Sequence, residues 1–179
     1  MTHIEQIEIP LSKKKMLLTL LGSIAFVGFG AFFAMNPTMF TDHDPIVVFS
    51  AGVVSVLFFG VVAIFLFRKL SDKKPGLTIN SRGITDNSSG ASIGLVLWSD
   101  IEGIEMTSVA NQKFLTITVE NPHDYINKAT NPVQRKGMQI NHRSYGSPIL
   151  ISANSLQTNL NSLQKLLTVK MEEYKATSN

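Results

Sequence analysis

Two long apolar runs without a charged residue dominate the first 67 residues of this 179-residue chain. They cover residues 16–35 and 46–67. At about 1.5 Å rise per residue, helices of these lengths extend about 30 and 33 Å, close to the hydrocarbon thickness of a bilayer. Core helices that long usually carry polar residues along one edge, whereas these runs offer only Thr, Ser and Gly. The sequence therefore predicts two transmembrane helices, and the first has no small-x-small cleavage site of a signal peptide at its end.

Basic residues lie on the outer side of both runs and are missing between them. The connecting residues 36–45 contain no Lys or Arg and include Asp42 and Asp44. The flanking basic residues are Lys13, Lys14, Lys15, Arg68, Lys69, Lys73 and Lys74. The positive-inside rule then predicts a cytoplasmic segment 1–15, an external loop 36–45 and a basic juxtamembrane linker 68–76, with both termini in the cytoplasm.

The charge distribution also argues against a nucleic-acid partner. The sequence pI is about 9.2, but residues 75–179 hold nine basic and eight acidic residues. The basic excess therefore lies beside the apolar runs, whereas a nucleic-acid-binding domain needs a basic stripe on its folded surface. Cysteine is absent, so the chain has no disulfide and no thiolate site.

Small residues gather on one side of each predicted span. Thr19, Ser23, Gly30 and Ala34 fall in one sector of the first helix. The second helix has Gly52, Ser55 and Ala63 in a broader sector. This pattern is typical of closely packed membrane helices, and it also fits the ordinary abundance of small residues in such helices. Neither span holds an ionisable residue, so we interpret the pair as an anchor and not as an ion or proton path.

The remainder, residues 77–179, is predicted to be a soluble domain. The pattern indicates short strands at 77–79, 84–86, 93–98, 101–106, around 114–119 and at 149–151, with period-two alternation in most of them and a continuous apolar run at 93–98. The irregular stretch 121–148 has room for short helices near 123–128 and 132–138. A C-terminal amphipathic helix follows, with Asn159 and Asn161 as alternative caps. The expected fold class is an α+β membrane protein, with a two-helix hairpin followed by a small curved antiparallel sheet or barrel closed by the last helix.

Three motifs in this order carry a family resemblance: GLTINSRGI at 76–84, LWSDIEGI at 97–104 and SPILISANSL at 147–156. Together with the paired spans, they make the chain similar to an uncharacterised bacterial family that places a pleckstrin-homology-like (PH-like) domain after a two-helix anchor. The resemblance implies a multi-pass protein of the bacterial inner membrane with no established catalytic residues. Eukaryotic lipid-binding relatives hold phosphoinositides with a Lys/Arg cluster near their first two strands, and here that turn offers only Arg82.

Catalytic and metal-binding patterns were not found in the sequence. It contains no P-loop, GxGxxG, HExxH or GxSxG motif. The four histidines, His3, His43, His123 and His142, are scattered, and Asp42, His43 and Asp44 are too close together to wrap a metal ion. Trp98 is expected to pack in the core or at its rim, and Asp100 to cap a turn after it. We therefore predict no enzyme activity, no metal and no cofactor.

The segment 128–146 is the most suggestive part of the soluble domain, because long ordered loops are often functional. Its interaction candidates are Arg135, Lys136, Arg143 and Tyr145. They suit contact with an acidic protein surface or with anionic lipid headgroups, and a plain surface insertion is the alternative. The predicted function is a membrane-anchored domain that binds an unknown protein partner or itself, and the second hypothesis is recognition of anionic phospholipids.

Overall fold

The chain forms two compact units. The computed structural model describes residues 6–40, 43–89, 94–109 and 111–178, and the side chains of 109 and 178 are left aside. One unit is the helical segment Lys13–Lys73, and the other combines Met1–Ser12 with Lys74–Asn179. The helical unit is thus inserted in sequence between two parts of a single α+β unit.

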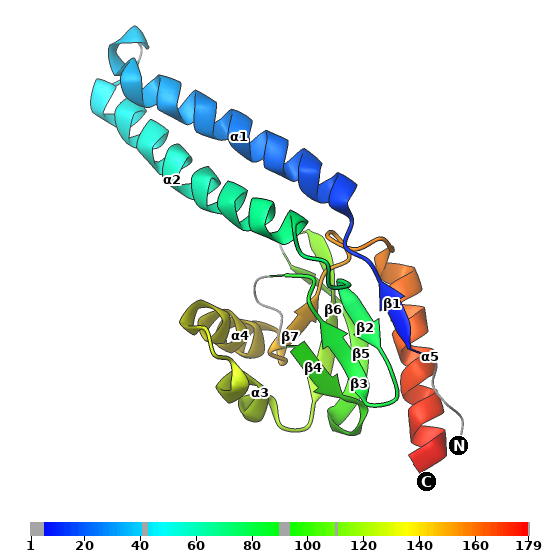
Figure 1. Ribbon diagram of the computed structural model, residues 1–179. Helices are drawn as coiled ribbons and strands as arrows, with labels where there is room; N and C mark the ends of the chain where they lie inside the picture. The colour runs from blue at the N-terminus through cyan, green and yellow to red at the C-terminus, as the bar shows by residue number, and fades with distance from the viewer. Residues whose placement is uncertain (1–5, 41–42, 90–93, 110, 179) are drawn as a thin grey trace. The chain divides into compact units, whose positions relative to one another are not determined.

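The helical unit consists of α1 (Lys13–Met35) and α2 (Pro45–Leu70), with a short 3-10 turn, η1 (Pro37–Met39), between them (Figure 1). The side chain of Asp44 accepts a hydrogen bond from the Ile46 amide at 2.8 Å, and Pro45 occupies the first turn. This combination is a strong start signal for a helix. Both helices are long and apolar enough to cross a membrane.

The two helices pack antiparallel through small residues. A Cβ atom added to Gly52 would lie 2.6 Å from the Ala34 nitrogen and from the Gly30 carbonyl oxygen, so the backbones meet there. Ser55 Oγ donates a hydrogen bond to the Phe26 carbonyl at 3.1 Å across the same contact. The predicted small-residue contact is confirmed for Gly30, Ala34, Gly52 and Ser55, because close backbone approach requires small side chains.

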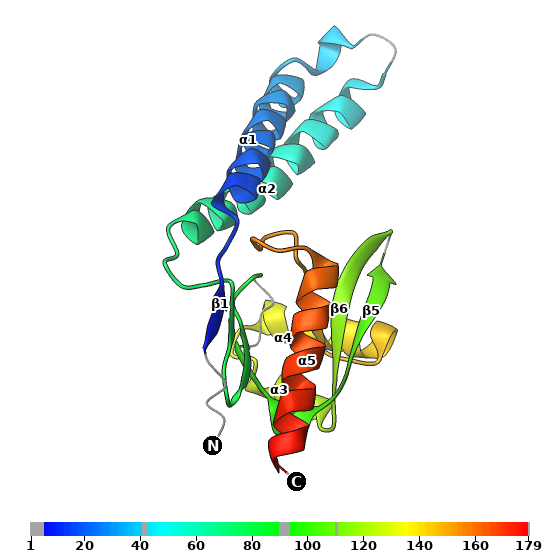
Figure 2. The ribbon, with the colours of Figure 1, turned by 90° about the vertical axis from the view of Figure 1, so that its right-hand side faces the viewer.

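Two antiparallel sheets build the α+β unit. The first has the order β1-β2-β3-β4 and the second the order β5-β6-β7. The bounds are β1 Ile7–Ile9, β2 Leu77–Ile79, β3 Gly83–Asp86, β4 Gly94–Leu97, β5 Ile101–Val109, β6 Gln112–Val119 and β7 Ile149–Ile151. A 3-10 turn, η2 (Trp98–Asp100), joins the sheets, and α3 (Pro122–Lys128) and α4 (Pro132–Tyr145) lie between β6 and β7. The final helix α5 (Leu160–Ser178) packs against β5 and β6 (Figure 2).

The core of this unit lies between the sheets and α5. Its fully buried apolar side chains come from strands of both sheets, from α4, from α5 and from the segment between β7 and α5, and include Leu77, Ile79, Ile84, Leu115, Ile117, Met138, Ile151, Leu156, Leu163 and Leu167. In β2 and β7 the buried residues alternate with partly exposed ones, in line with the period-two pattern predicted for these strands. The cap of α5 is Asn159, whose side chain accepts a hydrogen bond from the Ser162 amide at 2.9 Å.

The first strand, β1, was not predicted from the sequence. It pairs antiparallel with β2, with Ile7 opposite Ile79 and Ile9 opposite Leu77 (Figure 1). An isolated bridge between Leu11 and Leu156 continues this attachment. Segment 1–15 was predicted to be separate from the soluble domain. Instead, β1 within it is an edge strand of the first sheet of the α+β unit.

Trp98 is buried, as expected for a core residue, at 1% exposure. Its indole Nε1 donates a hydrogen bond to the Asn80 carbonyl at 2.8 Å, in the turn that joins β2 to β3. Gly83 closes that turn, and an added Cβ there would overlap the Val96 carbonyl oxygen. Only glycine fits this approach of two strands. The predicted strand 93–98 ends at Leu97, because Trp98 begins η2, and Ile93 lies outside the described residues.

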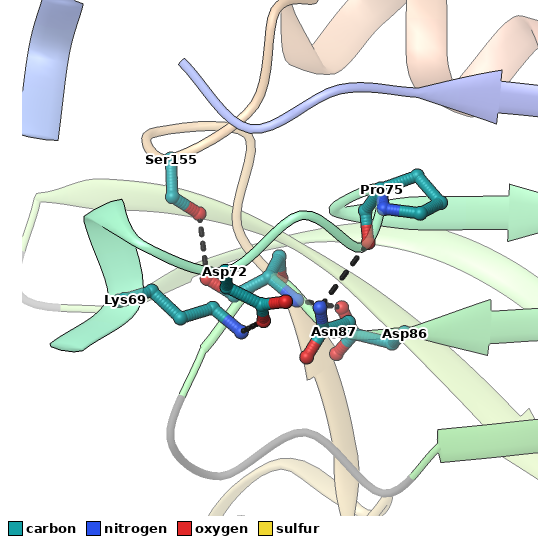
Figure 3. Close-up of polar contacts among 7 residues, drawn as sticks. Lys69, Asp72, Pro75, Asp86, Asn87 and Ser155 are labelled. Carbon is teal, nitrogen blue, oxygen red and sulfur yellow. Dashed lines mark hydrogen bonds and ion pairs between the residues drawn. The ribbon is translucent and has the colours of Figure 1, made fainter. Parts of the chain in front are cut away.

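Polar contacts tie the ends of these strands to neighbouring segments (Figure 3). Asn87 Nδ2 donates to the Pro75 carbonyl at 3.3 Å, which joins the end of β3 to the start of β2. Ser155 Oγ donates to the Ser88 carbonyl at 2.8 Å. Segments far apart in the sequence are thereby fixed at one end of the two central strands of the first sheet.

Candidate functional site: helices α3 and α4

The segment interpreted as a long loop is mostly helical. At the start of α4, the Asn131 side chain accepts a hydrogen bond from the Val133 amide at 2.8 Å, and Pro132 takes the first position. At its end, Gly146 adopts a left-handed conformation (φ 76°) and its amide donates to the His142 carbonyl. Proline at the first position and glycine past the last are standard boundary signals. The helix predicted at 132–138 therefore continues for two more turns.

Arg135, the first interaction candidate, is engaged within the domain. Its Nη2 donates to the carbonyl oxygens of Ala129 at 3.0 Å and of Asn127 at 3.5 Å. These carbonyls lie at the carboxyl end of α3, where a cation satisfies unpaired oxygens and interacts favourably with the helix dipole. Arg135 thus fixes α4 to α3, a role that the sequence did not indicate.

Lys136 and Arg143 lie on one exposed face of α4, because seven residues make about two helical turns. Two apolar side chains share that face: Val133 is 79% exposed and Ile140 is 53% exposed. We call these four residues the α4 outer face. Sequence reasoning missed its apolar pair, although the spacing of Val133 and Ile140 in an otherwise polar helix is a usable signal.

Tyr145 does not belong to this face. At about 100° per residue it lies on the side of α4 that carries Met138, which is 1% exposed. Tyr145 itself is half-buried. The structure therefore brings together two of the four predicted interaction residues, Lys136 and Arg143, and separates them from Arg135 and Tyr145.

The two helices also bring two histidines together. The rings of His123 on α3 and His142 on α4 meet edge to face, with centroids 5.3 Å apart. His142 Nδ1 lies 3.2 Å from the Gly146 carbonyl oxygen, at the cap of α4. Across the described ranges, no group of three or more His, Cys, Asp or Glu side chains has the geometry to hold a metal ion. Asp42, part of the sequence pattern around His43, lies outside them.

A buried tyrosine connects α3 to the junction of the two sheets. The Tyr125 hydroxyl donates to Asp100 Oδ2 at 2.6 Å and accepts from the Leu97 amide at 3.3 Å. Ser99 Oγ donates to the other Asp100 oxygen at 2.7 Å, and the Lys128 ammonium lies 4.7 Å from the centre of the Tyr125 ring. Asp100 thus accepts hydrogen bonds from the hydroxyls of Tyr125 and Ser99, whereas the sequence had predicted that it caps the backbone of the turn.

This network shifts the pKa values of Asp100 and Tyr125 in opposite directions. The hydrogen bonds from Tyr125 and then Ser99 hold the pKa of Asp100 below its usual value. Burial, and then the hydrogen bond to Asp100, raise the pKa of Tyr125 to about 12. The carboxylate and the protonated phenol are therefore the paired forms at neutral pH, which suits a fixed structural contact.

The predicted anchor residues lie at the start of α1 and at or just after the end of α2. Lys13, Lys14 and Lys15 form the exposed first turn of α1, which contains no acidic residue. The other four are Arg68 and Lys69 in the last turn of α2, and Lys73 and Lys74 shortly after it. Because α1 and α2 are antiparallel, both groups belong to the same end of the helix pair.

In comparisons with protein-family models, with curated proteins and with solved structures, no match to this chain was found.

Proposed function

We propose that this chain is a multi-pass protein of the bacterial inner membrane, with both termini in the cytoplasm. In this proposal α1 and α2 cross the bilayer, and the α+β unit is a PH-like domain without enzymatic activity. The domain binds a protein partner or a second copy of the chain through the α4 outer face.

The exposure of the apolar helices supports membrane insertion. In the most apolar 18-residue window of each helix, only 22% is buried in α1 and 6% in α2. A core helix of a soluble protein buries most of such a window, because exposed apolar surface in water is unfavourable. Lipid is the solvent in which exposed Leu, Val and Phe side chains on both helices are stable.

The pairing of β1 with β2 carries the proposed orientation. These strands precede α1 and follow α2 in sequence, yet they hydrogen-bond to each other in one sheet. If both helices cross the bilayer, a folded sheet that contains both strands requires them on the same side. An even number of crossings satisfies this requirement.

The basic residues that flank the helices indicate which side of the membrane the α+β unit occupies. Three lysines at the start of α1 oppose the helix dipole, at a cost of about 0.3–1 kcal/mol each at low ionic strength. Retention of cations at the unfavourable end fits a role in membrane orientation. Together with the cations after α2, they favour the cytoplasm for this end of the helix pair.

The order of elements supports a PH-like fold. The family resemblance implies a curved antiparallel sheet closed by a C-terminal helix. A four-stranded and a three-stranded antiparallel sheet, with α5 packed on β5 and β6, agree with that expectation. In this proposal the two spans are inserted between the first and second strands of the domain.

The α4 outer face supports the binding role. Within the described part of the α+β unit, large apolar side chains that are strongly exposed occur at Val133, Ile140 and Val169. Two of the three lie on this face, beside Lys136 and Arg143. Apolar residues next to cations suit a partner with an apolar patch and acidic neighbours.

Site-specific photocrosslinking tests this proposal. A photoreactive residue at Ile140 should give a discrete crosslinked protein species in native membranes, and the crosslink should fade when Lys136 and Arg143 become alanine. The same residue at Val169, which is 42% exposed on α5, is the matched control and should give none. Absence of a discrete species at Ile140, or equal yield at Val169, contradicts a binding role for this face.

A second candidate is recognition of anionic lipid by the same face. The observation in its favour is that α4 carries cations and no acidic residue. Each cation near an anionic leaflet contributes about 1 kcal/mol, and that contribution falls steeply with salt. Crosslinks from position 140 to lipid alone, lost at high salt, would favour this candidate over a protein partner.

A further inference from the structure

A shallow, open pocket lies at the end of α2, within the helical unit, and its exposed lining is mostly apolar. Its volume is about 470 Å³, and its lining residues are Phe65, Arg68, Lys69, Ser71 and Asp72. Phe65, Arg68 and Lys69 share one face of the helix because they are spaced by three and four residues. Ser71 ends the helix with its amide bonded to the Lys69 carbonyl, and this tight turn brings Asp72 back beside Lys69.

An ion pair fixes one wall of this pocket. Lys69 Nζ lies 3.0 Å from Asp72 Oδ2, and the two side chains are only 12% and 22% exposed (Figure 3). A pair this shielded holds both side chains in place better than a solvated surface pair. The Asp72 carboxylate also offsets the charge of Lys69, so that the net charge of the lining comes from Arg68.

Arg68 and Ser71 face outward beside an apolar side chain. Both are exposed, and Phe65 is 43% exposed. Across the described ranges, no carboxylate is ion-paired with Arg68. A guanidinium offers several N–H donors in a planar fork that matches the oxygens of a phosphate group. A serine hydroxyl supplies a further donor.

We propose that this pocket binds the headgroup of an anionic glycerophospholipid. Arg68 and Ser71 hold the phosphodiester, and the upper part of an acyl chain lies against Phe65. The inference rests on the proposed membrane anchoring, because residues directly after an apolar span lie at headgroup depth. The net positive lining favours an anionic lipid such as phosphatidylglycerol over a zwitterionic one.

Native mass spectrometry of the full chain in detergent, titrated with phosphatidylglycerol, tests the site. Wild type should bind phosphatidylglycerol more tightly than phosphatidylcholine. Arg68→Ala should weaken that binding at least about tenfold, as expected for loss of a charged hydrogen bond. Lys73→Ala removes the same charge nearby from an exposed residue that does not line the pocket, so it should leave the affinity within about twofold, the difference expected for a screened surface charge.

Asp72→Asn should change the affinity for lipid in the direction opposite to Arg68→Ala. It should tighten binding of phosphatidylglycerol, because it removes a negative charge that repels the phosphate from the pocket lining. Inorganic phosphate at the same concentration should leave the lipid bound, since it lacks the acyl chain that contacts Phe65. Displacement of the lipid by phosphate would overturn the assignment to a lipid.

Other outcomes also decide. Equal weakening by Arg68→Ala and Lys73→Ala, or no preference of wild type for the anionic lipid, would overturn the site. Membrane fractionation of the same variants separates this failure from failure of the proposed function. A chain that sediments with membranes but binds no lipid selectively removes only this inference, whereas a chain found in the aqueous fraction removes both.

Discussion

The contact between Tyr125 and Asp100 shows how a single buried hydroxyl organises the α+β unit. It connects α3 to the 3-10 turn that joins the two sheets, and Tyr125 is 1% exposed. Trp98, the only tryptophan, lies two residues from Asp100 in the same turn. Its fluorescence is therefore a direct reporter of the folded state of this junction.

Tyr125→Phe should destabilise this unit by about 1 kcal/mol at pH 7, less than a fully buried hydrogen bond to a charged group contributes, because Asp100 is half-buried. Denaturant titration of the detergent-solubilised chain, followed by Trp98 fluorescence, measures the change. Tyr174→Phe is the matched control, since Tyr174 is half-buried on α5, and it should cost less than about 0.5 kcal/mol. Equal effects of the two substitutions would contradict the account.

The same contact predicts a pH dependence. The pKa of Asp100 is lowered in the folded chain, so its contribution is present above the ordinary carboxyl value of about 3.9 and is lost as pH falls through the folded pKa. The pKa of Tyr125 is raised to about 12, so its contribution is complete below about 10 and is lost as pH rises toward 12. The stability advantage of wild type over Tyr125→Phe should therefore be largest in the neutral range and narrow at both extremes.

Among the individual elements, the attachment of the amino-terminal strand distinguishes this chain from a domain that simply follows its anchor. Besides the β1–β2 ladder, the Ser12 amide donates to the Ser155 carbonyl at 2.7 Å, and the Gln157 amide donates to the Pro10 carbonyl at 3.0 Å. Leu11 is 5% exposed in the same region. The segment before α1 thus contributes both hydrogen bonds and buried apolar surface to the α+β unit.

Leu11→Ala should destabilise the α+β unit by about 2–3 kcal/mol, because it removes buried methyl groups and leaves a cavity. Trp98 fluorescence again reports the loss, although the substitution lies 87 residues away in sequence. Glu8→Ala, an exposed change in β1, should stay within about 0.5 kcal/mol. Should Leu11→Ala leave the Trp98 transition unchanged, the segment before α1 would not be part of this fold.

The elements differ in how well the sequence predicts them. Strands β2, β3, β5, β6 and β7 follow from alternation, since each has one face in the core. Strand β1 was missed because three residues are too short for a periodic signal and the partner strand follows both spans. Helix α4 was predicted too short because Gly137 and many polar residues weaken its propensity, although Asn131-Pro132 and Gly146 mark its true ends.

The candidate site was only partly predictable. Lys136 and Arg143 were selected for their charge, and their shared face follows from helical spacing once α4 extends far enough. The role of Arg135 depends on where the preceding helix ends, and the contact between Asp100 and Tyr125 joins residues 25 positions apart. Local patterns cannot show either of these contacts.

At the scale of the whole molecule, the proposed architecture places the chain's two α+β segments on one side of a membrane and the turn between α1 and α2 on the other. If both helices cross the membrane, the pairing of β1 with β2 requires the two α+β segments to lie on the same side. The basic residues favour the cytoplasm for that side. The central claim is therefore a statement about sidedness, and the absence of cysteine from the sequence makes it directly testable.

Single cysteines at Gln6, Met39 and Ala176, each in the full chain, are labelled in spheroplasts with a membrane-impermeant maleimide, before and after permeabilisation. The account predicts that Met39→Cys is labelled in intact spheroplasts, and that Gln6→Cys and Ala176→Cys are labelled only after permeabilisation. Labelling of either terminal position from outside, or of all three without permeabilisation, would contradict it.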